Sequence, residues 1–161
     1  MYVINLANNL ADLGHRVDIF TRAHHQSDET ILTAHPDVRI IHLKEGNTDH
    51  YRNVNNFARH VVNFIKNQNL KFDMIHAHYY YSGLAGLLLK KQLKTPLVLS
   101  FHTLGEMKKI YSGVEDKKRV RAEKRIIDGS ETIIASTPLE QKDLISHYRV
   151  QPAKIQVVYT G

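Results

Sequence analysis

The 161-residue sequence predicts an α/β protein in which a parallel sheet is covered by helices on both faces. Short apolar stretches alternate along the chain with longer segments of helical periodicity, which is typical of repeated strand–helix–strand units. Two of these apolar stretches, 73–77 and 97–101, run directly into polar residues. Because ligands of open parallel sheets collect outside the carboxyl ends of the strands, these two strand ends predict the functional site.

The first part of the chain predicts one helix followed by two strands. Apolar residues recur at helical spacing over 2–13, and Gly14 suits the left-handed turn that ends such a helix. Strands are predicted at 16–20 and 38–43. The polar residues 45–53 predict a loop.

The remaining chain alternates between helices and strands. Helices are predicted at 53–69, 82–93, 116–128 and 138–147, and strands at 73–77, 97–101, 131–135 and 154–159. Thr137 and Pro138 suit the N-cap and first position of the last helix. Between Lys108 and the helix at 116 the chain is basic and polar, and no regular element is predicted there.

Composition indicates one globular domain and excludes several kinds of site. The sequence is 42% hydrophobic and 24% charged, as in ordinary soluble domains. It contains no cysteine, which excludes disulfides and thiolate metal sites. The longest apolar run, 84–89, is too short to span a membrane, and no signal peptide is recognisable, so a cytoplasmic protein is expected. The net charge of +6 favours anionic partners.

Two histidines lie at the end of the predicted strand 73–77. His76 and His78 alternate along the chain, so their side chains point to the same face of the sheet. No third ligand lies at a suitable spacing, and no metal site is expected. We interpret His76 as a packed strand residue, whereas His78 fits a pocket residue and the start of a loop equally well.

The second strand end carries the polar residues His102 and Thr103, then Gly105 and Lys108. An imidazole, a hydroxyl and an ammonium group at one strand end predict a pocket for a polar, hydroxylated, anionic ligand. Gly105 allows the backbone to come close to a ligand, or forms a simple turn. Lys108 offers a point charge to a phosphate, or is a solvated loop lysine.

The predicted helix 116–128 is strongly basic. Its basic residues are Lys117, Lys118, Arg119, Arg121, Lys124 and Arg125. We interpret most of them as a solvated face balanced by acidic neighbours, but Arg119 could bind a phosphate bidentately. The helix lacks interleaved aromatic residues, and neither a nucleic-acid-binding motif nor a glycine-rich dinucleotide fingerprint is present. Nucleic-acid binding and dehydrogenase activity are therefore not expected.

Four motifs carry a resemblance to a known family. They are His-Ala-His-Tyr-x-x-Ser-Gly at 76–83, His-Thr-Leu-Gly-x-x-Lys at 102–108, Arg-x-x-x-Glu at 119–123, and Ile-Ala-Ser-Thr at 134–137 with Glu140. Together they resemble the retaining glycosyltransferases of family 4, which have the two-domain GT-B fold. The most similar branch contains sucrose-phosphate synthase, sucrose synthase and the inositol-phosphate glycosyltransferase of mycothiol synthesis.

This resemblance implies that residues 1–161 form one domain, the Rossmann-like amino-terminal, acceptor-binding half of a GT-B fold. The family places a strand and a glycine-rich loop before the helix that opens this sequence. It also places a nucleotide-sugar-binding domain after the last strand. We therefore expect a fragment that lacks the first strand and the carboxyl-terminal domain, and that has no transferase activity by itself.

The resemblance also implies a reaction. A hexosyl group moves, with retention of configuration, from a nucleotide sugar, for which UDP-glucose is expected, to a sugar phosphate or polyol phosphate. No cofactor is expected besides the nucleotide-sugar co-substrate, which the absent domain mainly holds. His102 is implied as the catalytic residue beside the reacting sugar carbon. The implied residues for the acceptor and its phosphate are His78, Tyr79, Thr103, Gly105, Lys108 and Arg119.

Two other functions stay open. One is a stand-alone, non-catalytic module that binds sugar phosphates with the same pocket residues. The other is an enzyme such as a nucleotide-sugar epimerase on the same scaffold. An epimerase would need carboxylate acid and base residues at the strand ends, and no acidic pair is found there. The length of the native polypeptide separates the first alternative from the transferase.

Overall fold

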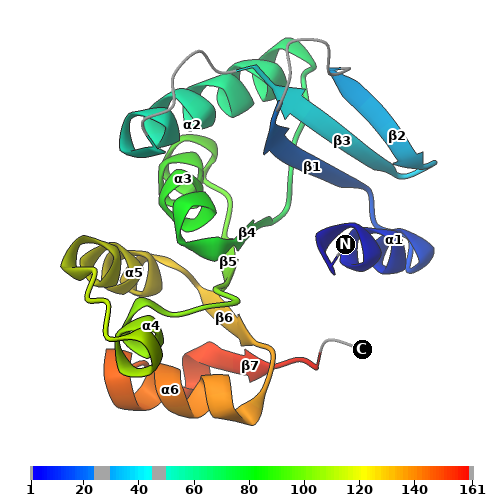
Figure 1. Ribbon diagram of the computed structural model, residues 1–161. Coiled ribbons are helices and arrows are strands. Elements are labelled where there is room, and N and C mark those ends of the chain that lie inside the picture. The colour runs from blue at the N-terminus through cyan, green and yellow to red at the C-terminus, as the bar shows by residue number, and fades with distance from the viewer. Residues whose placement is uncertain (1, 24–29, 45–49, 160–161) are drawn as a thin grey trace. The chain divides into compact units, whose positions relative to one another are not determined.

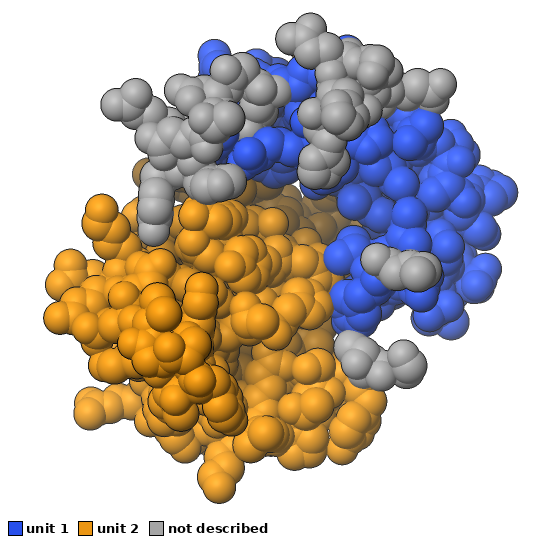
Figure 2. Space-filling view, in the orientation of Figure 1, with its two compact units in different colours: residues 1–64 blue, residues 65–161 orange. Residues whose placement is uncertain are grey.

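The computed structural model describes residues 2–23, 30–44 and 50–159, with the side chains of 50–52 left aside. The chain divides into two compact units, residues 1–64 and 65–161 (Figure 2). Each unit is described by itself. No helix in the described ranges has both the length and the apolar character needed to cross a membrane.

The first unit contains a three-stranded sheet and two helices (Figure 1). Its elements are α1 (Tyr2–Asp12), β1 (Val17–Arg22), β2 (Ile31–His35), β3 (Val38–Leu43) and most of α2 (His50–Asn67). The strand order is β1-β3-β2, with β1 parallel and β2 antiparallel to β3. Ala7 and Ala11 of α1 pack against Val38 to form a small core.

The antiparallel strand β2 was not predicted. All of its residues except His35 are exposed, so it shows no alternating burial pattern that the sequence could display. The predicted loop at 45–53 lies partly in residues 45–49, outside the described part of the chain. Its end was placed too late, because α2 already begins at His50.

The second unit is built on a parallel sheet with the order β4-β5-β6-β7 (Figure 1). Its strands are β4 (Ile75–His78), β5 (Leu97–Ser100), β6 (Thr132–Ala135) and β7 (Ile155–Val157). Its helices are α3 (Tyr79–Leu93), α4 (Gly105–Ser112), α5 (Lys117–Gly129), α6 (Pro138–Tyr148) and a short 3₁₀ turn at Pro152–Lys154. The predicted α/β class with a parallel sheet is confirmed.

Helix α3 packs on β4 and β5 and against α5, whereas α6 packs on β6 and β7. Close contact with α3 depends on glycine: a Cβ on Gly83 would lie 2.8 Å from a side-chain carbon of Ile126 in α5. A Cβ on Gly86 would lie 2.7 Å from Leu97 in β5.

In the second unit one helix was not predicted, and several element boundaries differ from the prediction by one to three residues. Helix α4 was missed entirely: its N-cap residue Leu104 provides no side-chain cap, so the usual sequence signal for a helix start is absent. Helix α3 begins at Tyr79, three residues before the predicted start, also without a side-chain cap. Strand β7 ends at Val157 instead of residue 159. By contrast, Thr137 caps α6 as predicted, accepting a hydrogen bond from the Glu140 amide.

Candidate functional site

The carboxyl ends of β4 and β5 lie next to each other, as the sequence predicted. The two strands are paired in parallel register, with His78 opposite Ser100. Strand β4 leads directly into α3 at Tyr79, and β5 leads through residues 101–104 into α4. The segments that carry both motifs therefore follow neighbouring strand ends at one edge of the sheet.

One residue just beyond each strand end has an unusual backbone conformation. Tyr79 has a φ of 73° and His102 a φ of 62°, which side-chain-bearing residues seldom adopt. Among the other described residues besides glycine, Asn69, Lys94 and Arg149 also have positive φ: Asn69 follows the end of α2, and Lys94 and Arg149 are helix C-caps, where this conformation is common. Tyr79 is instead the first residue of α3, and His102 lies between β5 and α4, so neither is a helix C-cap. Strained conformations of this kind cluster at functional sites.

Three histidines line one face at this edge. His76 Nε2 lies 2.9 Å from Ser100 Oγ, and His78 Nδ1 lies 3.0 Å from His102 Nε2. The ring centroids of His76 and His78 lie 4.1 Å apart, with the ring planes tilted by 36°, so the two side chains share a face as predicted. Our interpretation of His76 as a packed residue agrees with its hydrogen bond to the buried Ser100.

Burial keeps two of these imidazoles neutral. Burial, with a smaller contribution from the nearby His102, lowers the pKa of His76 to about 4. Burial also lowers the pKa of His78 to about 3, with smaller contributions from His76 and His102. A neutral imidazole can donate from one ring nitrogen and accept at the other, so His78 can hold His102 without adding charge.

Arg119 and Thr103 form a bonded pair beside Tyr79. Arg119 Nη2 donates to the Thr103 carbonyl oxygen at 2.7 Å and to Thr103 Oγ1 at 3.0 Å. The guanidinium carbon lies 5.1 Å and 5.0 Å from the ring centroids of Tyr79 and Tyr80, within cation–π range. The structure thus brings Tyr79, Thr103 and Arg119 together, although they lie far apart in the sequence.

A buried carboxylate holds this pair in place. Glu123 is fully buried and accepts a 2.8 Å hydrogen bond from Arg119 Nε. It also accepts from the Gly105 amide, at 3.1 Å and 3.0 Å to its two oxygens. The hydroxyl of Tyr148 in α6 donates to Glu123 Oε2 and accepts from the Glu106 amide. Burial, followed by the hydrogen bond to Glu123, raises the pKa of Tyr148 well above its usual range.

Gly105 and Lys108 lie close to this network in the chain but play different parts. The Gly105 amide faces Glu123, and a Cβ at this position would lie 3.0 Å from Glu123 Oε2. Gly105 is the first residue of α4. The absence of a side chain at this position lets the backbone lie close to Glu123, and this close contact is within the protein and not with a ligand. Lys108 is exposed on α4, and in the described part of the chain no hydrogen bond or ion pair engages its ammonium group.

The sequence prediction gave no role to Glu123 or Tyr148. Glu123 was noted in the Arg-x-x-x-Glu motif and as one of the acidic residues that balance a solvated face, which is wrong because it is fully buried. Tyr148 carried no motif at all. A glutamate in the middle of a basic helix, four residues after Arg119, was a signal that could have indicated the pair. Nothing in the sequence around Tyr148 indicates its contact with Glu123.

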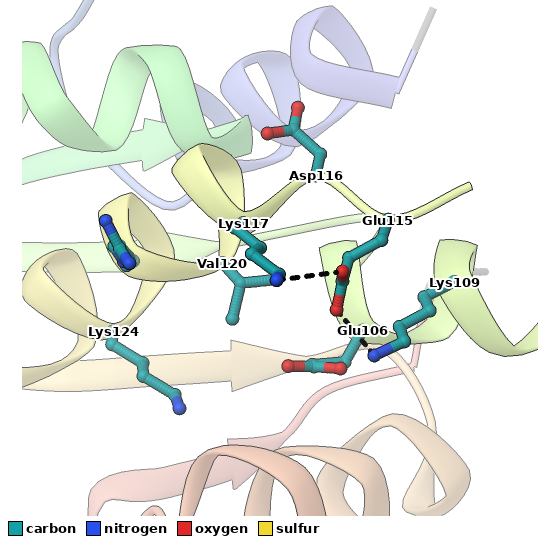
Figure 3. A pocket seen from close by; sticks show the side chains of 8 residues that line it. Glu106, Lys109, Glu115, Asp116, Lys117, Val120 and Lys124 are labelled. Carbon is teal, nitrogen blue, oxygen red and sulfur yellow. Dashed lines mark hydrogen bonds and ion pairs between the residues drawn. The ribbon is translucent and has the colours of Figure 1, made fainter. Parts of the chain in front are cut away.

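A separate pocket lies between α4 and α5 (Figure 3). Its lining residues are Glu106, Lys109, Glu115, Asp116, Lys117, Val120, Arg121 and Lys124. The ammonium groups of Lys109 and Lys117 both reach the Glu115 carboxylate, at 2.6 Å and 3.5 Å. Because these charges already pair with one another, we do not assign the site to this pocket. No group of three His, Cys, Asp or Glu side chains in the described ranges is arranged to hold a metal ion.

Comparison with known proteins identifies the family. Residues 1–161 match the model of Glycosyltransferase Family 4, and the chain belongs to this family. A D-inositol 3-phosphate glycosyltransferase of Corynebacterium aurimucosum is 32% identical over 100% of this chain and 41% of its own length. One from a Nocardioides species is 31% identical over 100% of this chain and 38% of its own length. The chain thus spans about two fifths of these relatives.

A solved structure shows the same fold. Sucrose-phosphate synthase from Thermosynechococcus elongatus superimposes with a TM-score of 0.86 and 24% identity, over 99% of this chain and 42% of that one. The GT-B-type fold and the family resemblance predicted from the motifs are both confirmed.

Proposed function

We propose that the chain is the acceptor-binding part of a retaining glycosyltransferase. This enzyme would move a hexosyl group from a nucleotide sugar, UDP-glucose in our proposal, to a sugar phosphate or polyol phosphate. The observation that carries the proposal is the Arg119–Thr103 pair beside Tyr79, at the carboxyl ends of β4 and β5. The relative named for D-inositol 3-phosphate supports a phosphorylated polyol as the acceptor.

The proposed phosphate site uses groups that the protein leaves available. Arg119 carries a permanent charge, and in the described part of the chain no hydrogen bond uses its Nη1. Because Thr103 Oγ1 accepts from Arg119, its own proton can be donated to a phosphate oxygen. The Tyr79 hydroxyl would be a further donor. Lys108, exposed on α4, would add positive charge nearby.

The imidazole of His102 would lie beside the hydroxyl groups of the acceptor that take part in the reaction. His102 precedes Thr103, so a sugar whose phosphate is bound there has its ring near the imidazole. His78 contacts His102 and would fix the orientation of its ring. In the reaction, the acceptor oxygen bonds to the anomeric carbon as the bond to the nucleoside diphosphate breaks. The acceptor proton passes to the leaving diphosphate, and no protein nucleophile is required.

The direct test is an assay of the native full-length gene product. UDP-glucose would be supplied with D-inositol 3-phosphate or fructose 6-phosphate, and with inositol or fructose as unphosphorylated counterparts. We expect transfer to a phosphorylated acceptor. Thr103→Val should raise the KM for the phosphorylated acceptor about tenfold, because one charge-assisted hydrogen bond is lost. His102→Ala should mainly lower kcat.

Lys118→Ala is the control, since Lys118 is an exposed lysine on the same helix as Arg119. This variant should leave KM and kcat unchanged. Absence of transfer to every phosphorylated acceptor would refute the proposal. Binding of these acceptors without transfer would favour a non-catalytic sugar-phosphate-binding module instead.

A further inference from the structure

We infer that Glu123 and Tyr148 are positioning residues for acceptor binding: they hold Arg119 and Thr103 in the geometry that receives a phosphate ester. The inference rests on the proposed function, because it deepens the description of the same site. It concerns two side chains on α5 and α6 that the proposed function does not use. Neither would touch the ligand.

Glu123 fixes the orientation of the Arg119 side chain. Arg119 is 5% exposed and Glu123 0%, so the ion pair is shielded from solvent. The carboxylate binds Nε at 2.8 Å, which directs the other end of the guanidinium group toward Thr103. A planar guanidinium held at two of its nitrogens cannot rotate freely. Its remaining nitrogen therefore has a defined direction.

The same carboxylate also fixes the segment that carries Thr103. Helix α4 begins two residues after Thr103, and its first amide, at Gly105, donates to both oxygens of Glu123. Its second amide, at Glu106, donates to the Tyr148 hydroxyl at 3.1 Å. Since Leu104 provides no side-chain cap, Glu123 and Tyr148 take the place of the missing N-cap.

The Tyr148 hydroxyl connects the Glu123 carboxylate, which holds Arg119, with the first turn of α4, which follows Thr103. It donates to Glu123 while accepting from Glu106, so both its donor and its acceptor function are used. Arg119 and Thr103 are thus held through one carboxylate, and that carboxylate is held by a phenol from a third helix. Preorganised groups of this kind bind more tightly because less conformational freedom is lost on binding.

The test compares two conservative variants in the native full-length gene product. Tyr148→Phe removes only the hydroxyl. Glu123→Gln keeps the shape but replaces one acceptor oxygen with an N–H donor, which faces other donors. The control is Glu131→Gln, because Glu131 also binds a backbone amide (Leu97) and a cation (Lys90). Leu97 is the first residue of β5, at the opposite end from the site.

Calorimetry would measure binding of D-inositol 3-phosphate and fructose 6-phosphate, and steady-state kinetics would separate KM from kcat. For Tyr148→Phe and Glu123→Gln we expect an increase of about tenfold in Kd and KM for the phosphorylated acceptor, a loss of roughly 1.4 kcal/mol. The Kd for UDP-glucose should be unchanged. Amide hydrogen exchange at Gly105 and Glu106 should become faster in Tyr148→Phe. The control should match the wild type in acceptor binding.

If both variants bind the acceptor with wild-type affinity, the inference is overturned, even if their melting temperatures are lower. The hydrogen bonds of Glu123 and Tyr148 would then contribute only to stability. If Glu123→Gln does not fold, Tyr148→Phe decides the outcome alone. A wild-type protein that binds a phosphorylated acceptor but transfers nothing would refute the transferase proposal, and the variants would still test the inference by calorimetry. A wild-type protein that binds neither probe would overturn both.

Discussion

At the scale of single residues, the imidazole of His76 links stability to pH. Burial, and to a smaller extent His102, lowers its pKa to about 4, whereas a histidine in an unfolded chain titrates near 6.5. Between these values the unfolded state binds a proton that the folded state does not. The contribution of His76 is therefore fully present above about pH 6.5, and it is lost as the pH falls toward about 4.

His76→Gln should remove this dependence. Between pH 6 and pH 4.5, the free energy of unfolding of the wild type should fall more steeply than that of the variant, by about 1.4 kcal/mol per pH unit. Urea unfolding at several pH values measures the two slopes. Ser100→Ala is the control, because it removes the partner of His76 but keeps the titrating ring. Equal slopes for wild type and His76→Gln would contradict the prediction.

At the scale of elements, the packing of α3 depends on having no side chain at Gly83. Alanine is normally better than glycine inside a helix by up to about 1 kcal/mol. Here the added methyl group would lie 2.8 Å from Ile126 and 3.1 Å from Leu99, both of which are fully buried. We expect the overpacking to outweigh the helix propensity.

Gly83→Ala should lower the free energy of unfolding by roughly 1–3 kcal/mol, measured by urea denaturation. Ser82→Ala is the matched control, because Ser82 is the preceding, exposed residue of the same helix. Its effect should stay within about 0.5 kcal/mol. A Gly83→Ala protein as stable as the wild type would show that α3 and α5 can separate at little cost.

At the scale of the whole molecule, acceptor binding and transfer should be separable. The chain spans 41% of the length of a curated relative, and all the acceptor-site residues proposed above lie within residues 65–161. We predict that the 161-residue chain, prepared alone, transfers no hexosyl group from UDP-glucose.

The measurement compares this chain with the native gene product under the same assay, after circular dichroism has verified that both are folded. Transfer by the 161-residue chain alone would contradict the prediction. The mass of the native polypeptide, detected with an antibody to this chain, would show whether it is two to three times longer, as the relatives suggest.

The sequence by itself determined the α/β class, most strands and helices, the family, and the edge of the sheet where the site lies. Alternation of apolar and polar residues is a local property, so it can be read without the fold. The motifs at 76–83 and 102–108 are equally local, and both strand ends meet where they were predicted.

Tertiary structure alone decided how the site is held. Helix α4 has no capping signal of its own; its first two amides bind Glu123, 18 residues away, and Tyr148, 42 residues away. Strand β2 exists because it pairs with β3, although its side chains are mostly exposed. Arg119, which we propose as a phosphate ligand, is 5% exposed and bonded to Glu123 and Thr103, contacts that its position in a basic helix does not reveal. These features depend on hydrogen bonds between distant segments, and such bonds leave no periodic pattern in the sequence.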